Sequence, residues 1–473
     1  MHRNAAWTRC NRTRIRHHLL HGVAPFILAA GPLIGVPQKT GLCQDRARVP
    51  NIVLIVADDL GYADVGFQGC QDIATPNIDA LAKSGVRFTS GYVSCPVCSP
   101  TRAGLLTGRY QQRFGHEFNP GRAQQDPSEI GLPLSETTLA DALKSAGYAT
   151  SLVGKWHLGD APKFHPQRRG FDEFFGFLGG GHSYVELRAE MPAPIYRGAE
   201  PVNEPAYLTD ALAREAVDFI QRHRDAPFFL YLTFNAVHAP LQATDTYLKR
   251  FSAIADERRR TYAAMLSAMD DSVGAVARSL REHGLDEQTL VFFISDNGGP
   301  SHVQPSRNTP LSGNKGTVME GGIRVPFVMS WKGHIAAGSA FDEPVISLDI
   351  FATVAAAARV QRTQDCVRDG VDLLPYVTGK ARGAPHEFLF WRFGQQYAVR
   401  HGRWKLSQLA DGPLRLYDLR ADIAETQDQS AAEPKVVEEL SRAYAEWSAQ
   451  LATPRWQPAR AARRARNRAR SAG

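Results

Sequence analysis

The feature that most constrains the fold is a pair of short apolar runs, each of which ends abruptly in acidic or amide side chains. The first run, residues 52–57, is followed by Asp58 and Asp59, and the second, in "QTLVFFISDNGG", is followed by Asp296 and Asn297. Continuous apolar runs of this length are typical of strands that are buried on both faces. The two runs therefore predict a sheet that is covered by helices on both sides.

Helical segments alternate with these strands. "TPNIDALAKSG" predicts a short helix with Thr75 as its cap, and "RRTYAAMLSAMDDSVGAVARSLREHG" predicts a long helix. "SETTLADALKSAGYATSLVGKWHLG" predicts a helix, a turn at Gly147 and a strand, and "APFFLYLTFNAVHAP" predicts another buried strand. Strands that alternate with helices indicate a mostly parallel sheet. Polar residues at the carboxyl ends of such strands meet at one edge, which is the usual place for a site in an open α/β sheet.

The pattern changes near residue 380. "HEFLFWRFGQQYAVRHGRWKLSQL" and "PLRLYDL" read as short alternating strands of an antiparallel sheet, and "PKVVEELSRAYAEWSAQL" predicts a final helix. We therefore expect an α/β domain over residues 49–380, built on a large mixed, mostly parallel sheet between helices. A small α+β domain with an antiparallel sheet is expected over residues 381–454.

Positive charge is concentrated at the two ends of the chain. The net charge of the whole chain is +7, and residues 1–50 and 455–473 each carry +7, so the part between them carries −7. This balance does not favour a nucleic-acid-binding face, and no nucleic-acid partner is expected. We expect residues 455–473 to be a disordered, solvated basic tail, although such a tail can also bind an anionic polymer or surface.

The first residues have the pattern of a secretory signal. Five arginines precede the apolar stretch "LLHGVAPFILAAGPLIGV", and Pro25 and Pro32 interrupt that stretch, so no transmembrane anchor is expected. We predict a signal peptide over residues 1–36 and an exported protein, periplasmic or secreted; an unstructured extension is the alternative. Beyond the leader the sequence contains no Asn-x-Ser/Thr acceptor, which favours a bacterial source.

The polar residues at the two strand ends are candidate metal ligands. Asp58, Asp59, Asp296 and Asn297 offer the hard oxygen ligands that Ca²⁺ and Mg²⁺ prefer, and three carboxylates more than neutralise a divalent charge. The alternative is that "DD" and "DNGG" are ordinary surface turns. Two such pairs at equivalent strand ends favour the metal site.

The stretch "SCPVCSPTRAGLLTGRY" contains Cys95 and Cys98, two of six cysteines. The pair allows three interpretations: a redox dithiol, half of a zinc site, or two buried apolar side chains. None of them accounts for the residues that follow Cys98. Pro100 suits a first helical turn, with Ser99 before it as a cap, which would place residue 98 at a helix N-terminus. Backbone N–H groups and the helix dipole favour an anion there.

The string "CSPTRAGLLTGR" resembles the motif of the sulfatase family, which is Cys-x-Pro-x-Arg followed by a helix that ends near Thr-Gly-Arg. The resemblance covers about residues 50–451 and includes the following elements in order: "IVADDLGYADVGFQG", "TPNIDALAKSGVRFT", "GYATSLVGKWHLG", "RRGFDEFFGF", "FNAVHAPL", "FISDNGG", "GNKGTVMEGGIRVPFVMSWKG" and "LYDLRAD". It implies the alkaline-phosphatase-like fold and the arylsulfatase-like hydrolysis of a sulfate monoester.

The resemblance also implies that Cys98 is oxidised to formylglycine (3-oxoalanine) by a dedicated maturation enzyme. One hydroxyl of the hydrated aldehyde would attack sulfur to give a sulfo-enzyme intermediate, and the other would then expel sulfate. Cys95 becomes a bystander. The implied metal ligands are Asp58, Asp59, Asp296, Asn297 and residue 98, and the implied ion is one Ca²⁺, with Mg²⁺ as the alternative.

The remaining implied roles belong to cations and histidines. Arg102 is expected to brace residue 98 and the metal site, while Lys155 and Lys315 bind sulfate oxygens. We expect His238 to be the general acid for the leaving oxygen and His157 to deprotonate the retained hydroxyl, since histidine can act in either direction near neutral pH.

The substrate is less constrained. An exported sulfatase suggests a sulfated polysaccharide or its fragment, and aromatic, Arg and His side chains suit a sulfated sugar. Two rival functions remain: a formylglycine-dependent phosphodiester or phosphonate monoester hydrolase, and a non-catalytic carbohydrate-binding relative. The residues with a possible substrate contact, for which packing is an equal alternative, are His116, Glu117, Asn119, His182, Trp391 and Arg392.

Overall fold

The computed structural model describes residues 49–120, 126–185, 193–360 and 367–457. The predicted signal peptide, three of the six cysteines (Cys10, Cys43 and Cys366) and all but the first three residues of the predicted tail lie outside these ranges. The described helices, in chain order, are α1 Pro76–Ser84, α2 Cys98–Thr107, α3 Leu139–Ser145, α4 Leu208–His223, α5 Asp245–Leu248, α6 Glu257–Glu282, α7 Glu320–Ile323, α8 Asp349–Ala357, α9 Leu374–Val377 and α10 Pro434–Ser448.

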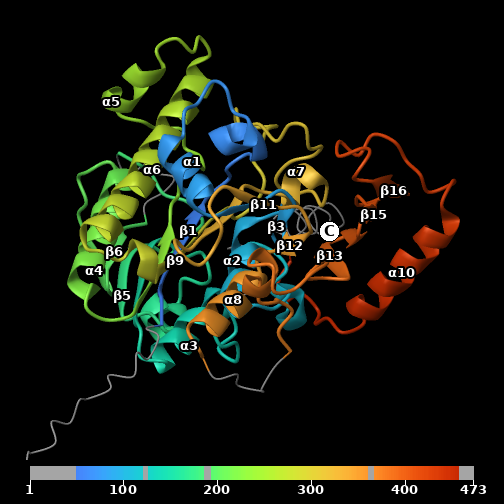
Figure 1. Cartoon of the computed structure of the whole chain (residues 1–473), viewed down its shortest axis with the longest axis horizontal. Helices are drawn as coiled ribbons and strands as arrows, with labels where there is room; N and C mark the ends of the chain where they lie inside the picture. The colour runs from blue at the N-terminus through green and yellow to red at the C-terminus, as the bar shows by residue number, and fades with distance from the viewer. Residues whose placement is uncertain (1–48, 121–125, 186–192, 361–366, 458–473) are drawn as a thin grey trace, which may run out of the picture. The chain divides into compact units, whose positions relative to one another are not determined.

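A ten-stranded mixed sheet forms the centre of the described residues (Figure 1). Its five central strands, β9, β1, β8, β4 and β5, are all parallel to one another, while β10, β6 and β7 run antiparallel to their neighbours. In spatial order the strands are β11 Ser339–Phe341, β2 Val86–Phe88, β10 Phe327–Ser330, β9 Thr289–Ser295, β1 Asn51–Ala57, β8 Phe228–Thr233, β4 Ala149–Lys155, β5 Glu173–Phe177, β6 Ile195–Arg197 and β7 Glu200–Val202. The mostly parallel sheet is confirmed.

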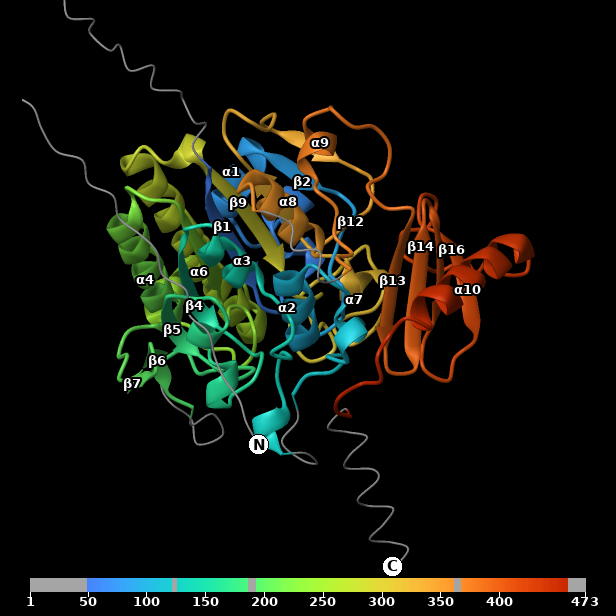
Figure 2. The same ribbon diagram turned by 90° about the horizontal axis from the view of Figure 1, so that it is seen from below.

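The central strand β1 is buried on both faces, as its continuous apolar sequence predicts. Val53 and Ile55 belong to a core cluster with α1, α4 and α6, whereas Ile52, Leu54 and Val56 belong to a second cluster with α2, α3 and α8. Alternate side chains of a strand point to opposite faces, so an unbroken apolar run fills both cores. Figures 1 and 2 show α4 and α6 on one side of the sheet and α2 and α8 on the other.

The N-terminus of α1 is capped from another helix. The expected cap, Thr75, makes no side-chain hydrogen bond to the helix backbone. Instead the Asp270 carboxylate of α6 accepts from the backbone N–H groups of Asn77 and Ile78 at 2.8–3.2 Å. Thr75 occupies the predicted cap position, but a carboxylate distant in sequence, and not the Thr75 side chain, satisfies the free N–H groups of the helix.

Removing this cap tests its contribution to stability. Asp270→Ala is expected to lower the free energy of unfolding by about 1–2 kcal/mol, the usual cost of losing an N-terminal cap, measured by urea denaturation. Asp271→Ala is the matched control, since Asp271 is a half-exposed partner of Arg250, and its loss should cost less than about 0.5 kcal/mol. Equal losses in the two variants would contradict the capping role.

The predicted C-terminal antiparallel sheet is confirmed. It consists of β13 Phe388–Phe393, β14 Gln396–His401, β15 Trp404–Gln408 and β16 Leu414–Asp418, paired in that order. Helix α10 packs on this sheet, with Leu440 against Val399, Leu406 and Leu416 (Figure 2). The domain division at residue 380 stays a prediction.

A two-residue pairing, β3 Gly91–Tyr92 with β12 Val345–Ile346, lies outside both sheets. Within the ranges that the structure describes, no helix combines the length and apolar character needed to cross a bilayer.

Candidate active site

Four neighbouring parallel strands bring the motif residues together. The strands lie in the order β9, β1, β8 and β4. Asp296 and Asp58 directly follow β9 and β1, Lys155 ends β4, and His238 lies in the loop that follows β8. Residues that are as far apart in sequence as 58 and 296 thus meet at one edge of the sheet, as expected for carboxyl ends of parallel strands. Gly154 of β4 allows this strand to lie close to β8, because a Cβ at residue 154 would lie 1.9 Å from the Thr233 carbonyl oxygen.

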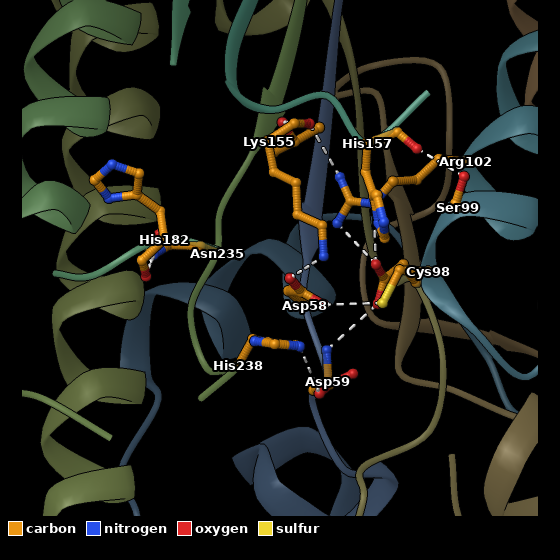
Figure 3. Close-up of polar contacts among 12 residues, drawn as sticks. Asp58, Asp59, Cys98, Ser99, Arg102, Lys155, His157, His182, Asn235 and His238 are labelled. Carbon is orange, nitrogen blue, oxygen red and sulfur yellow. Dashed lines mark hydrogen bonds and ion pairs between the residues drawn. The ribbon is translucent and has the colours of Figure 1, made fainter. Parts of the chain in front are cut away.

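Carboxylates and one thiol form the centre of the site. Ligand atoms of Asp58, Asp59, Asp296 and Cys98 all lie within 4.8 Å of one another, and all four side chains are buried. The Cys98 sulfur lies 3.6 Å from Asp58 Oδ1 (Figure 3). The Asp59 backbone N–H donates to Asp296 Oδ1 over 3.3 Å. Three buried carboxylates this close together repel one another unless cations lie among them.

Asn297 lies beside this cluster. Its Nδ2 donates to Asp59 Oδ1 at 2.7 Å and to the Gly298 carbonyl oxygen at 3.0 Å. Its Oδ1 is buried and has no hydrogen-bond partner among the described residues. A buried acceptor without a donor is costly, and a cation beside the carboxylates would satisfy it. The donor set therefore fits a hard divalent ion.

Three cations of the protein already contact the carboxylates. Lys155 Nζ lies 2.5 Å from Asp58 Oδ2, and Arg102 donates to Asp296 Oδ2 from Nε at 3.0 Å and Nη2 at 2.7 Å (Figure 3). Lys315 Nζ lies 2.6 Å from Asp59 Oδ1 and 3.2 Å from the Cys98 sulfur. The pairing places positive charge on both sides of residue 98, where an anionic substrate group would be stabilised.

The electrostatics of the carboxylates are unequal. Burial acts to raise the pKa of Asp58, but Lys155, His238 and Arg102 outweigh it and hold this pKa below its usual range. The pKa of Asp296 is raised by burial and by the negative charge of Asp58, despite its pairing with Arg102. Burial therefore opposes the negative charge of Asp296 more strongly than Arg102 supports it.

Residue 98 begins helix α2. The predicted cap Ser99 is wrong, because the helix starts at Cys98 and the cap position is Val97. The Ser99 N–H donates instead to Asn119 Oδ1 at 2.9 Å, and the Ser99 hydroxyl lies 2.7 Å from His116 Nε2 and donates to the His157 carbonyl oxygen at 2.6 Å. The expected position of residue 98 at a helix N-terminus is confirmed.

The dithiol interpretation finds no support in the environment of the two cysteines. Both are free, and both are buried. Burial raises the pKa of Cys98 to about 12 and that of Cys95 well above its ordinary value. Redox exchange requires a thiolate, which neither environment stabilises near neutral pH.

The two candidate proton-transfer groups differ in exposure. His157 is buried, its Nδ1 has no hydrogen-bond partner in the described part of the chain, and burial lowers its pKa well below the ordinary value. The His238 side chain is 23% exposed, with Nε2 at 3.7 Å from Asp59 Oδ2 and Nδ1 at 2.6 Å from the Ala239 carbonyl oxygen. His157 has a φ of 59° and Asp59 a φ of 63°, so two side chains of the site lie on strained backbone, a feature common at functional sites.

Several residues that were suggested to contact the substrate instead bond other residues of the protein. Trp391 is fully buried, and its indole N–H donates to the Val93 carbonyl oxygen. The prediction that Trp391 contacts the substrate is therefore wrong. Arg392 forms a bidentate pair with Glu117 at 2.7 and 3.0 Å. The ring nitrogens of His182 lie 2.7 Å and 2.9 Å from the carbonyl oxygens of Ser183 and Ala193. His116 and Asn119 support Ser99, as described above. Packing therefore explains these residues.

The contacts made by Ser99, His116 and Asn119 are functional features that the sequence patterns missed. The helix-start motif drew attention to Ser99 only as a cap. No local signal connects it to His157, which is 58 positions away. Only the meeting of α2 with the end of β4 reveals the contact.

The fold and the site together define the class of the protein. The sheet is mostly parallel and covered on both faces, and carboxylates, lysines and a helix N-terminus meet at its carboxyl edge. This arrangement is that of a hydrolase with the alkaline-phosphatase-like fold. The sulfatase family model matches residues 50–360, more than half of the chain. The chain belongs to the sulfatase family and is a hydrolase of sulfate esters.

Two curated relatives and one solved structure agree with this membership. N-acetylgalactosamine-6-sulfatase of Mus musculus is 38% identical over 399 residues, 80% of this chain and 75% of the relative. Arylsulfatase A of Bos taurus is 34% identical over 432 residues, 84% of this chain and 82% of the relative. The crystal structure of Ps i-CgsB in complex with k-i-k-neocarrahexaose has a TM-score of 0.82 and 38% identity, and covers 86% of this chain and 95% of the other.

Proposed function

We propose that the protein releases inorganic sulfate from a sulfated carbohydrate, with residue 98 matured from cysteine to formylglycine and one Ca²⁺ bound beside it. The observation that carries the proposal is the cluster of Asp58, Asp59, Asp296 and Cys98 within 4.8 Å, next to the unpartnered Oδ1 of Asn297. The modified residue would supply a hydroxyl nucleophile, and the ion would supply a Lewis acid.

The five metal ligands in this proposal are oxygen donors of a kind that suits Ca²⁺, with Mg²⁺ as the alternative. Ca²⁺ accepts more ligands and more irregular geometry than Mg²⁺, and this crowded donor set favours it. The ligands are Asp58, Asp59, residue 98, Asp296 and Asn297.

The protein's own residues bind the sulfate and move protons. Lys155 and Lys315 would hold sulfate oxygens, since the Lys315 ammonium contacts the Cys98 sulfur and the Lys155 ammonium contacts Asp58, which also contacts that sulfur. Arg102 would keep Asp296 in place through its two hydrogen bonds. His238, the more exposed histidine, suits a general acid that protonates the leaving alcohol. His157 suits a base, because its lowered pKa keeps the imidazole neutral.

The substrate class follows from the relatives. N-acetylgalactosamine-6-sulfatase is named for a sugar, and Ps i-CgsB is in complex with k-i-k-neocarrahexaose. We infer a sulfated polysaccharide fragment as substrate, a formylglycine-generating enzyme as maturation partner, and an exported, periplasmic or secreted location that follows from the leader over residues 1–36. The division into domains at residue 380 belongs to the same proposal.

Maturation is tested by mass spectrometry of the tryptic peptide that contains Cys98, from protein made in its native host. We expect a mass about 18 Da below that of the thiol peptide, whereas ordinary thiol oxidation adds oxygen. An unmodified thiol in active protein would exclude the formylglycine mechanism.

The reaction is tested by parallel assays on sulfated oligosaccharides, 4-nitrophenyl sulfate and bis(4-nitrophenyl) phosphate. Sulfate release is expected to be the fastest reaction. Faster phosphodiester cleavage would instead establish the rival hydrolase class, and binding of sulfated oligosaccharide without any turnover by matured protein would establish the carbohydrate-binding alternative.

A further inference from the structure

The loop that carries Lys315 has a backbone that can adopt many conformations. It spans residues 311–319, between the end of β9 and α7, and it contains Gly313 and Gly316 at φ of 77° and 89°. Glycines in this region of backbone space restrict the chain very little. The Lys315 side chain adds four further rotatable bonds. The loop is held in part by hydrogen bonds between Asn314 and Thr317 and by one from Asn308 to the Gly313 carbonyl oxygen. Contacts beyond these would further restrict where the Lys315 ammonium lies, 2.6 Å from Asp59 and 3.2 Å from the Cys98 sulfur.

The C-terminal sheet supplies a contact at the middle of this loop. Gln396, the first residue of β14, donates from Nε2 to the Gly316 carbonyl oxygen at 2.9 Å. The Gly316 N–H in turn donates to the Pro96 carbonyl oxygen at 2.9 Å, two residues before Cys98. Gly316, the residue that follows Lys315, is thus held on both sides: its carbonyl by the C-terminal sheet and its N–H by the segment that leads into α2.

A buried glutamate joins the two ends of the same loop. Glu425, in the segment after β16, accepts with Oε2 from the Ser312 hydroxyl at 2.9 Å and from the Glu320 backbone N–H at 2.8 Å. One carboxylate oxygen therefore bonds both the beginning of the loop and the first residue of α7. Glu425 has a φ of 54°, so its backbone is held in a conformation that glutamate rarely adopts.

A buried charge cluster fixes Glu425. Lys405 of β15 is fully buried and lies 2.8 Å from Glu425 Oε1 and 2.9 Å from Glu320 Oε1. Glu320 Oε2 also accepts from the Tyr92 hydroxyl at 2.5 Å and pairs with Arg324 at 3.3 Å. Buried ion clusters often stabilise a protein less than apolar packing of the same volume. This cluster instead fixes the position of the Glu425 carboxylate, and through it connects the C-terminal sheet to both ends of the Lys315 loop.

We propose that Gln396 and Glu425 are positioning residues for sulfate ester hydrolysis, acting through Lys315. The C-terminal sheet then takes part in turnover without touching the sulfate group, because it limits where the Lys315 ammonium can lie. This inference rests on the proposed function, in which Lys315 binds sulfate oxygens beside residue 98.

The experiment compares Gln396→Leu with Gln408→Leu in the matured, full-length protein. Gln408 is the matched control: it lies on the adjacent strand β15, is similarly half-buried, and also donates to a glycine carbonyl, that of Gly412, at 3.1 Å. Gln396→Leu should lower kcat for 4-nitrophenyl sulfate about 10-fold, since small displacements of a catalytic group cost this much or more. Gln408→Leu should stay within about twofold of wild type, because its bond lies away from the Lys315 loop.

A double-mutant cycle separates positioning from general damage. If Gln396 acts through Lys315, adding Gln396→Leu to Lys315→Ala should change kcat by less than about twofold, because coupled residues are not additive. Independent, multiplied losses would overturn the proposal, as would equal activities of the two glutamine variants. Glu425→Gln provides a second test, and it should show the same dependence on Lys315 when activity is normalised to folded protein.

The controls distinguish failure of this inference from failure of the proposed function. Lys315→Ala with unchanged turnover would overturn the role of Lys315 itself, and the positioning proposal with it. Lys315→Ala with a large loss, together with an unaffected Gln396→Leu, would overturn only the positioning proposal.

Discussion

Replacing Cys98 by alanine is expected to reduce sulfate release by more than about 10⁴-fold, the scale on which loss of a covalent nucleophile acts in other hydrolases. The remaining lysines and metal ligands would still bind the sulfate group, but no group at the start of α2 could attack sulfur. Initial rates on 4-nitrophenyl sulfate measure the effect, and thermal denaturation checks that the variant is folded.

Cys95→Ala is the matched control, since Cys95 is also buried and free and lies three positions away. The Cys95 sulfur makes a weak contact with the Glu117 carbonyl oxygen at 4.0 Å. We expect its rate to stay within about threefold of wild type, with a modest loss of stability from the small cavity. A collapse of activity in folded Cys95→Ala would revive the dithiol interpretation.

Asn297→Ala is expected to remove the metal ion and to lower the rate more than about 100-fold. Loss of a group that merely supports a metal ligand already costs 10–100-fold in affinity or activity, and Asn297 is proposed as a direct ligand. Elemental analysis after dialysis would measure bound Ca²⁺ and Mg²⁺. Millimolar Ca²⁺ should restore part of the activity, because the three carboxylates remain.

Asn308→Ala is the control for Asn297→Ala. Asn308 is also buried and lies in the same region, but its amide bonds only the protein: Oδ1 accepts from the Gly299 N–H at 3.0 Å, and Nδ2 donates to the Gly299 carbonyl oxygen at 2.7 Å. Its loss should lower the melting temperature and leave the metal content unchanged. Full metal occupancy in Asn297→Ala would remove Asn297 from the ligand set.

The strands, the long helix and the antiparallel C-terminal sheet could be predicted because each depends on local periodicity. The run at residues 52–57 becomes β1 with both faces buried, and "RRTYAAMLSAMDDSVGAVARSLREHG" becomes most of α6. The side chains that accept from the free N–H groups at the helix starts were mispredicted for a physical reason. A helix N-terminus needs an acceptor, and nothing requires that acceptor to be nearby in the chain. Asp270 serves α1, and Asn119 serves α2, where Thr75 and Ser99 were expected.

The candidate substrate residues are used within the protein for a related reason. Tryptophan, arginine and glutamate suit a sugar, but they also suit a buried junction between the C-terminal sheet and the segments that contain Val93 and Glu117. Trp391 and the pair Arg392–Glu117 are used in that junction. The sequence indicates which hydrogen bonds and ion pairs a side chain can form. It does not indicate whether the partner is a substrate or another residue of the protein.

The sequence by itself determined the residue types of the site and their place at the ends of strands, because apolar runs followed by acids and the helix-start motif are local properties of the chain. Tertiary structure alone decided the strand order β9, β1, β8, β4, which makes four distant segments neighbours. It also decided that Gln396 and Glu425 bond the Lys315 loop, over separations of 80 and 113 residues. Hydrogen bonds and charge pairs depend on distance in space, and only the packed sheets bring these atoms within 3 Å of one another.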